Sequence, residues 1–111
     1  MERALVDEFI ELVSIDAESG DEAEIAARVM SKLTEIGLDV EMDDAGSKFG
    51  GNAGNVIGRI GEGDPIIVCA HLDRVKPGKG IKPVVDDGIV RSSGDTVLAA
   101  DDILGVVAIL A

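Results

Sequence analysis

The segment that most constrains the fold of this 111-residue chain is the unbroken apolar run Ile66 to Ala70. A short apolar run of this kind predicts a strand that is buried on both faces of a sheet. Directly after it come His71, Leu72 and Asp73, so the only histidine of the chain lies at the carboxyl end of the predicted strand. Open α/β sheets bind ligands at that edge. The position of His71 therefore indicates a functional site.

Composition narrows the class of protein. Hydrophobic residues make up 46% of the chain but aromatic residues only 2%, so the core must be aliphatic, as in helix-covered sheets. The net charge of −12 opposes binding to nucleic acids and to anionic membranes. No apolar run approaches the roughly 18 residues of a membrane span, and no export signal is visible. The single cysteine, Cys69, is expected to be buried in the strand, and its lack of a partner fits a cytoplasmic location.

Two amphipathic helices are predicted at the start of the chain. Apolar residues recur at helical spacing from Leu5 to Val13. Ser19 and Glu22 match a capping box that opens a second helix, roughly 20–36, and Gly37 supplies its end.

The remaining pattern predicts strands and a final helix. Residues 38–43 alternate as an edge strand does, 44–54 read as a loop, and 55–60 as a short strand. Asp87-Gly88 between β-branched residues predicts a hairpin, and 96–100 predict a second buried strand. The apolar start of a helix then runs to the end of the chain without a cap, which suggests truncation. The expected fold is α/β, with a mixed, mainly parallel sheet flanked by helices.

Asp101 and Asp102 follow the second predicted buried strand. In a parallel sheet, both carboxyl ends would bring these aspartates near His71 and Asp73, around a metal ion. Imidazole nitrogen with carboxylate oxygen suits zinc, with cobalt or manganese as alternatives, and a bridging carboxylate can serve two metals that activate water. The residues alone also allow a surface histidine with an acidic neighbour, and an aspartate pair that caps a helix.

Four segments, taken in order, resemble one known family. They are Ala70–Val75 (AHLDRV), 76–83 (KPGKGIKP), 85–90 (VDDGIV) and 98–102 (LAADD), followed by Gly105. This order is similar to the peptidase T-like (tripeptidase) branch of the dizinc aminoacylase, carboxypeptidase and tripeptidase family. The likeness covers nearly the whole chain, and its specificity lies between residues 70 and 105.

The resemblance implies a role for each residue of the predicted site. His71 would ligate one zinc, Asp73 would be the catalytic residue that orients its imidazole, and Asp101 would bridge two zincs. Asp102 would be a neighbour without a ligand role. The family also implies a cis peptide bond between Asp101 and Asp102.

Two positions depart from the family pattern, which usually has threonine at Arg74 and lysine at Ile103. The family's paired glutamates (general base and ligand), another carboxylate ligand and a second histidine lie downstream of the bridging aspartate. With His71 as its only histidine, the chain cannot supply a complete dizinc site. Residues 1–111 are thus expected to be the N-terminal part of a zinc-peptidase-like catalytic domain, lacking the remainder of that domain and a lid or dimerisation domain.

The expected function of the full-length protein is hydrolysis of short peptides by metal-activated water, as a tripeptidase-like aminopeptidase. The 111-residue chain is expected to be inactive by itself. Two alternatives stay open: an N-acyl amino acid deacylase or carboxypeptidase-like amidohydrolase with the same ligands, and a non-catalytic association module. The expected partners are a short peptide and, through exposed apolar surface, another copy of the chain as a homo-oligomer or a missing half.

Overall fold

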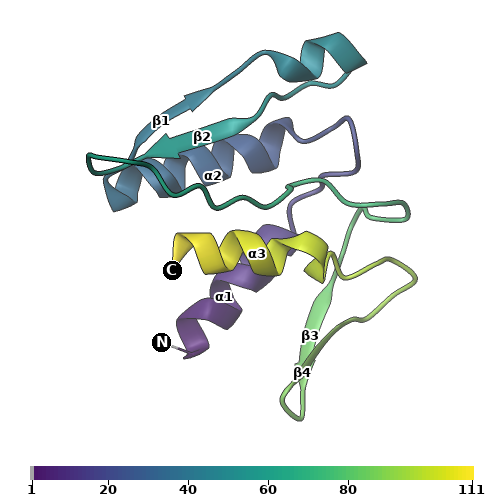
Figure 1. The fold of residues 1–111 in the computed structure, drawn as a ribbon. Helices are drawn as coiled ribbons and strands as arrows, with labels where there is room; N and C mark the ends of the chain where they lie inside the picture. The colour runs from purple at the N-terminus through teal and green to yellow at the C-terminus, as the bar shows by residue number, and fades with distance from the viewer. Residues whose placement is uncertain (1) are drawn as a thin grey trace.

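The computed structural model describes residues 2–111, which form three α-helices, one 3₁₀ helix and four short strands (Figure 1). The elements follow in the order α1 (Glu2–Val13), α2 (Ala23–Ile36), β1 (Asp39–Met42), η1 (Ala45–Phe49), β2 (Val56–Arg59), β3 (Pro83–Asp86), β4 (Ile89–Ser92) and α3 (Ala100–Leu110). The chain is thus a mixed α/β structure, as predicted. None of these helices is both long enough and apolar enough to cross a membrane.

The core is built from one apolar stripe on each α-helix. Its most deeply buried large side chains are Leu12 and Val13 of α1, Ile25 of α2 and Ile103 of α3. Burying one such aliphatic side chain contributes about 1.5–3 kcal/mol to stability. Because α1 and α3 pack against each other in this core, the start of α3 is held in a fixed place relative to α1.

Ion pairs join α1 to α2 at the rim of the core. Lys32 of α2 is largely buried and places Nζ 2.5 Å from Glu8 Oε1 and 3.1 Å from Glu11 Oε1. Arg28 Nε lies 2.6 Å from Glu11 Oε2. The hydrogen bond from Arg28 holds the pKa of Glu11 below its usual value, and the Lys32 ammonium adds to this effect against a smaller cost of desolvation.

The ends of α2 confirm one prediction and correct another. Gly37 has φ = 109° and donates its N–H to Leu33 O and Thr34 O, the left-handed C-cap that the sequence predicts. The capping box is wrong, because α2 begins at Ala23 and the Ser19 hydroxyl bonds Asp73 instead. Glu22 accepts a hydrogen bond from the Gly20 N–H and makes no side-chain cap.

The strands form two antiparallel pairs. β1 pairs with β2 from Asp39↔Arg59 to Met42↔Val56, and this pair lies across α2 (Figure 1). The predicted hairpin is also confirmed, because β3 and β4 pair around Asp87-Gly88. Both turn residues have positive φ, 51° and 77°, as a two-residue type I′ turn requires.

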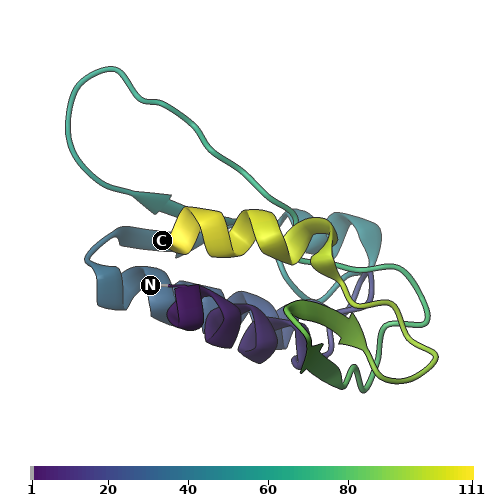
Figure 2. The ribbon, with the colours of Figure 1, turned by 90° about the horizontal axis from the view of Figure 1, so that it is seen from below.

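The predicted buried strands at 66–70 and 96–100 are not formed, and neither is a parallel sheet among residues 2–111. Ile66 is 92% exposed and Ile67 83% exposed, and Cys69 is exposed as well, contrary to its expected burial. The connection from β2 arches away from the helices before it reaches this segment (Figure 2). A strand needs a neighbour for its N–H and C=O groups, and the described residues place none beside this apolar segment.

Candidate metal centre

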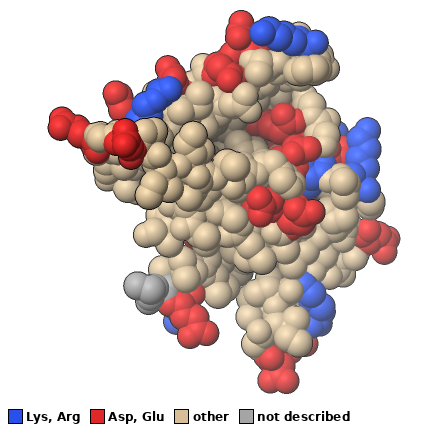
Figure 3. All heavy atoms as spheres, in the orientation of Figure 1, with Lys and Arg blue, Asp and Glu red and all other residues tan. Residues whose placement is uncertain are grey.

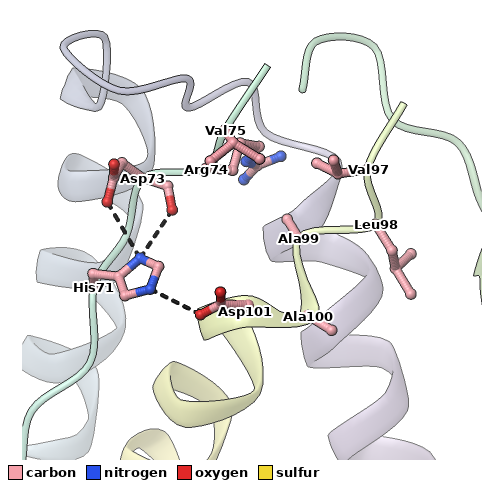
Figure 4. A pocket seen from close by; sticks show the side chains of 9 residues that line it. All are labelled: His71, Asp73, Arg74, Val75, Val97, Leu98, Ala99, Ala100 and Asp101. Atoms are coloured by element: carbon pink, nitrogen blue, oxygen red, sulfur yellow. Dashed lines mark hydrogen bonds and ion pairs between the residues drawn. The ribbon is translucent and has the colours of Figure 1, made fainter. Parts of the chain in front are cut away.

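His71 joins two segments that are far apart in the sequence (Figure 4). Its Nε2 atom lies 3.0 Å from Asp101 Oδ1 at the start of α3. Its Nδ1 atom lies 3.0 Å from the backbone oxygen of Asp73 and 3.2 Å from Asp73 Oδ1. The structure therefore brings together the three residues that the sequence predicts for the site, although the parallel strands expected to position them are not formed.

The contacts of Nδ1 settle which ring nitrogen can bind a metal. A backbone carbonyl oxygen only accepts hydrogen bonds, so Nδ1 must carry a hydrogen to bond Asp73 O. In the neutral ring Nε2 then has a lone pair, and this lone pair faces the Asp101 carboxylate. The Nε2 lone pair and the Asp101 carboxylate oxygen both attract a positive charge to the space between them. Without a metal, a proton on Nε2 supplies that charge.

The electrostatics of His71 agree with this geometry. Partial desolvation lowers the pKa of His71, but the hydrogen bonds to Asp101 and Asp73 and both negative charges outweigh it. The pKa of His71 therefore lies above its usual value of about 6.5. The site favours a positive charge at Nε2.

Asp101 lies in the non-helical first turn of α3. Residue Ala99 precedes it with φ = 69°, and the peptide bond from Asp101 to Asp102 is cis, as the resemblance implies. The Asp101 side chain is 95% exposed, so its carboxylate remains open to a ligand. Asp102 instead lies over Gly105, where an added Cβ would come 2.6 Å from its Oδ1. Ala99, and not an aspartate, is the N-cap residue of α3. Both aspartates lie in the first turn of α3, where negative side chains interact favourably with the helix dipole, so this part of the capping alternative agrees with the structure.

A cavity of about 310 Å³ opens beside these side chains. It is lined by the site residues and by the segment that leads into α3: His71, Asp73, Arg74, Val75 and 97–101 (Figure 4). Acidic side chains also lie in and beside a hollow on the face shown in Figure 3, in keeping with the net charge of −12. The surroundings of the site suit a cation and leave space beside it.

The donor atoms of His71 and Asp101 are of the kind that zinc binds, but there are too few of them for a complete zinc site. One imidazole nitrogen and one carboxylate oxygen are ordinary zinc ligands, whereas a catalytic zinc takes three protein ligands. Among residues 2–111, no group of three or more His, Cys, Asp or Glu side chains is placed to hold a metal ion. His71 and Asp101 together are therefore a candidate two-ligand half of a metal site.

Sequence reasoning missed two residues that support the site. Ser19, assigned to a capping box, donates its hydroxyl to Asp73 Oδ2. Arg74 is only 2% exposed and donates from Nη1 to Val13 O, 2.8 Å away, at the end of α1. Its departure from the family residue was the only signal at this position, and no sequence signal pointed to Ser19.

Comparisons with known proteins agree with the motifs. No protein-family profile matches the chain. YqjE of Bacillus subtilis (strain 168), described as uncharacterized, is 43% identical over 110 residues, which are 96% of this chain and 30% of YqjE. The crystal structure of aminopeptidase PepT from Bacillus cereus ATCC 10987 is similar with a TM-score of 0.89 and 38% identity. The crystal structure of a tripeptidase from Staphylococcus aureus subsp. aureus Mu50 has a TM-score of 0.87 and 35% identity.

Each of the two structures matches 99% of this chain, and the match covers 31% of the PepT chain and 31% of the tripeptidase chain. The chain thus spans about a third of the length of the proteins that it matches. Sequence identity and backbone agree over the residues that carry the motifs. The resemblance that residues 70–105 predict is therefore confirmed: over the segment that it spans, this chain is similar in sequence and backbone to the PepT aminopeptidase and to the tripeptidase.

Proposed function

We propose that a protein containing this segment is a zinc-dependent, tripeptidase-like aminopeptidase that hydrolyses short peptides. The observation that carries the proposal is the approach of His71 Nε2 to Asp101 Oδ1, while Asp73 Oδ1 contacts the other ring nitrogen, Nδ1. The PepT and tripeptidase structures support the substrate class, because their fold matches this chain over nearly all of its length. The single cysteine, which has no partner for an intrachain disulfide, supports a cytoplasmic protein.

Each residue has a distinct part in this proposal. His71 holds one zinc through Nε2, and Asp73 keeps the hydrogen on Nδ1 and the ring in place. Asp101, whose side chain is 95% exposed, would be the carboxylate ligand, and it is open to a second ion as well. Zinc, when bound, supplies a Lewis acid that activates water and polarises a carbonyl. The neighbouring cavity leaves room for a peptide next to this centre.

The 111-residue chain is inactive by itself under this proposal. Two ligands do not fix the coordination number of a catalytic zinc. Asp73, which contacts the His71 ring, is bonded to both His71 and Ser19 and is not free to act as a general base. A general base and further ligands must come from other residues.

A segment exchange tests the proposal directly. Replacing the matching 31% of the B. cereus PepT chain with residues 1–111 gives a hybrid whose metal site depends on this chain for its half-site. We expect the hybrid to hydrolyse a tripeptide, and His71→Ala or Asp101→Ala to abolish hydrolysis. Asp102→Asn is the matched control, because it removes one carboxylate beside Asp101 and should leave most activity.

Two results decide the matter. A folded hybrid whose tripeptide hydrolysis survives His71→Ala would refute the assignment of His71. Hydrolysis by the purified 111-residue chain alone, lost on adding a chelator, would refute the claim that the segment is inactive by itself.

The deacylase or carboxypeptidase-like alternative uses the same two ligands and is separated by substrate. A longer polypeptide that continues this chain should cleave tripeptides and leave N-acyl amino acids intact. The association alternative is favoured by one observation, the exposed apolar segment from Ile66 to Val68. We propose that this surface binds another polypeptide, either a further part of the same protein or a second copy of the chain.

A further inference from the structure

We infer that Ser19 is a positioning residue for the metal ligand His71 and that it acts through the carboxylate of Asp73. Ser19 lies in the connection between α1 and α2, far in sequence from both site segments. The role in metal binding rests on the proposed function. The hydrogen bonds from which we argue are present in the chain without a metal.

The backbone around Ser19 is fixed against the segment that bears the site. Arg74 donates its N–H to Ala17 O at 3.0 Å, and Ser19 donates its N–H to Arg74 O at 3.1 Å. These two bonds form an isolated parallel bridge between Glu18 and Arg74. The Ser19 hydroxyl is therefore held beside the residue that precedes Arg74, which is Asp73.

Two further bonds tie the same connection to the site segment. Glu18 Oε2 accepts the Gly78 N–H at 3.0 Å, and Asp16 Oδ1 accepts the Gly80 N–H at 2.8 Å. Removing the Ser19 hydroxyl leaves these contacts and the backbone bridge in place. Among residues 2–111, the hydroxyl itself hydrogen-bonds only Asp73 Oδ2 and, at 3.4 Å, the backbone oxygen of Arg74. That backbone oxygen keeps its bond from the Ser19 N–H, so the main effect of the change falls on Asp73.

The two carboxylate oxygens of Asp73 contact different residues. Ser19 Oγ donates to Asp73 Oδ2, and Asp73 Oδ1 lies 3.2 Å from His71 Nδ1. Because the Asp73 side chain is 40% exposed, packing alone does not fix the rotation of its carboxylate. With the hydroxyl absent, the carboxylate can turn toward water, and Nδ1 keeps only the backbone oxygen of Asp73 as acceptor.

The consequence reaches the metal-binding nitrogen. Loss of one acceptor for the Nδ1 hydrogen raises the population of the tautomer that carries its hydrogen on Nε2. In this tautomer Nε2 has no free lone pair and cannot bind a metal. Groups that orient a metal-bound histidine typically account for 10–100-fold in metal affinity. Ser19 is one hydrogen bond further away, so we expect its loss to weaken zinc binding by about threefold to tenfold.

The test uses the 111-residue chain with Ser19→Ala, Ser19→Thr and the matched control Ser14→Ala. The Ser14 hydroxyl bonds Ile10 O within α1 and has no contact with the site, so its loss reports a general effect of removing a serine hydroxyl near this connection. Nitrogen NMR of the metal-free chain, at a pH where His71 is neutral, measures the two tautomers. Competition with a chromophoric chelator measures zinc affinity.

We expect Ser19→Ala to lower the Nδ1–H population and to weaken zinc binding, Ser19→Thr to restore both, and Ser14→Ala to change neither. In an Asp73→Ala background, Ser19→Ala should have no further effect. Should Ser19→Ala fail to fold, Ser19→Cys keeps the volume with a much weaker donor and should show the same loss.

Two outcomes would overturn the inference. One is a folded Ser19→Ala chain whose tautomers match those of the parent chain. The other is an equal loss of the Nδ1–H population in Ser14→Ala. A parent chain that binds no zinc would instead contradict the proposed function, and the metal-free tautomer measurement would still decide the role of Ser19.

Discussion

His71 Nε2 and Asp101 Oδ1 lie 3.0 Å apart although 30 positions separate the two residues in the sequence. Contacts with α1 and with the connection after it fix the positions of both residues. Asp101 lies on α3, which packs against α1. His71 lies on the segment in which Arg74 is bonded to Val13 at the end of α1 and to Ala17 and Ser19 in the connection after it. The helix α1 and the connection after it therefore act as the common support of both halves of the site.

Arg74 is a buried charged residue, 2% exposed, that contacts this support. Replacing it by alanine removes the hydrogen bond to Val13 O and the packing of its stem against Gly78. We expect Arg74→Ala to lower the free energy of unfolding by about 1–3 kcal/mol. Urea denaturation followed by circular dichroism measures this.

Arg74→Met is the comparison for that change. It keeps the aliphatic stem and removes a buried charge whose Nε and Nη2 atoms have no hydrogen-bond partner. We expect Arg74→Met to cost less stability than Arg74→Ala. A larger loss for methionine than for alanine would show that the charge itself stabilises the fold.

Gly54 is required by the close approach of the chain to Asp43. A Cβ at Gly54 would lie 1.9 Å from Asp43 O, so the loop must shift to accept any side chain. We expect Gly54→Ala to destabilise the chain by about 1–3 kcal/mol. Gly94→Ala is the matched control, since a Cβ there meets no atom within 4 Å and thermal denaturation should be nearly unchanged.

The ion pairs of Glu11 give a prediction on pH. The folded pKa of Glu11 is lowered, so its stabilisation is present above the unfolded pKa of about 4.3 and is lost as pH falls through the folded pKa. Because the side chain is 40% exposed, screening limits the effect to about 1 kcal/mol or less. Glu11→Gln should thus be less stable than the parent chain at pH 7 and equally stable near pH 2. A constant difference across this range would rule out the ionised carboxylate as its cause.

The exposed apolar segment predicts self-association of the isolated chain. Ile66, Ile67 and Val68 present a contiguous apolar edge with unpaired backbone groups. We expect analytical ultracentrifugation to show association that increases with concentration, and Ile67→Lys to reduce it. Phe49→Lys, at the exposed end of η1, is the control, and an equal reduction by both variants would assign the association to general hydrophobicity.

Local patterns predicted the local structure well. The stripe from Leu5 to Val13, the cap at Gly37 and the turn at Asp87-Gly88 depend on interactions between near neighbours, and all three are confirmed. The buried strand at 66–70 failed because a strand forms only with a partner, and periodicity does not report whether one is present.

The site was predicted in a different way. Residue types after two predicted strands suggested metal chemistry, and the family resemblance assigned the roles of His71, Asp73 and Asp101. The structure brings these three residues together. Ser19 was missed because its hydroxyl has two possible acceptors, a helix N–H or a distant carboxylate, and the sequence favours the nearer one. Only the packing of the α1–α2 connection against Arg74 decides between them.

The most direct test of the proposed zinc half-site is a zinc titration of the 111-residue chain, followed through the imidazole nitrogens of His71. Asp101→Asn and Asp102→Asn serve as a matched pair, because each removes one negative charge from adjacent positions. We predict a saturable shift of Nε2 with Nδ1 still protonated, weaker binding in Asp101→Asn, and unchanged binding in Asp102→Asn. Zinc binding that leaves Nε2 unmoved, or that is equally weakened in both variants, would contradict the account.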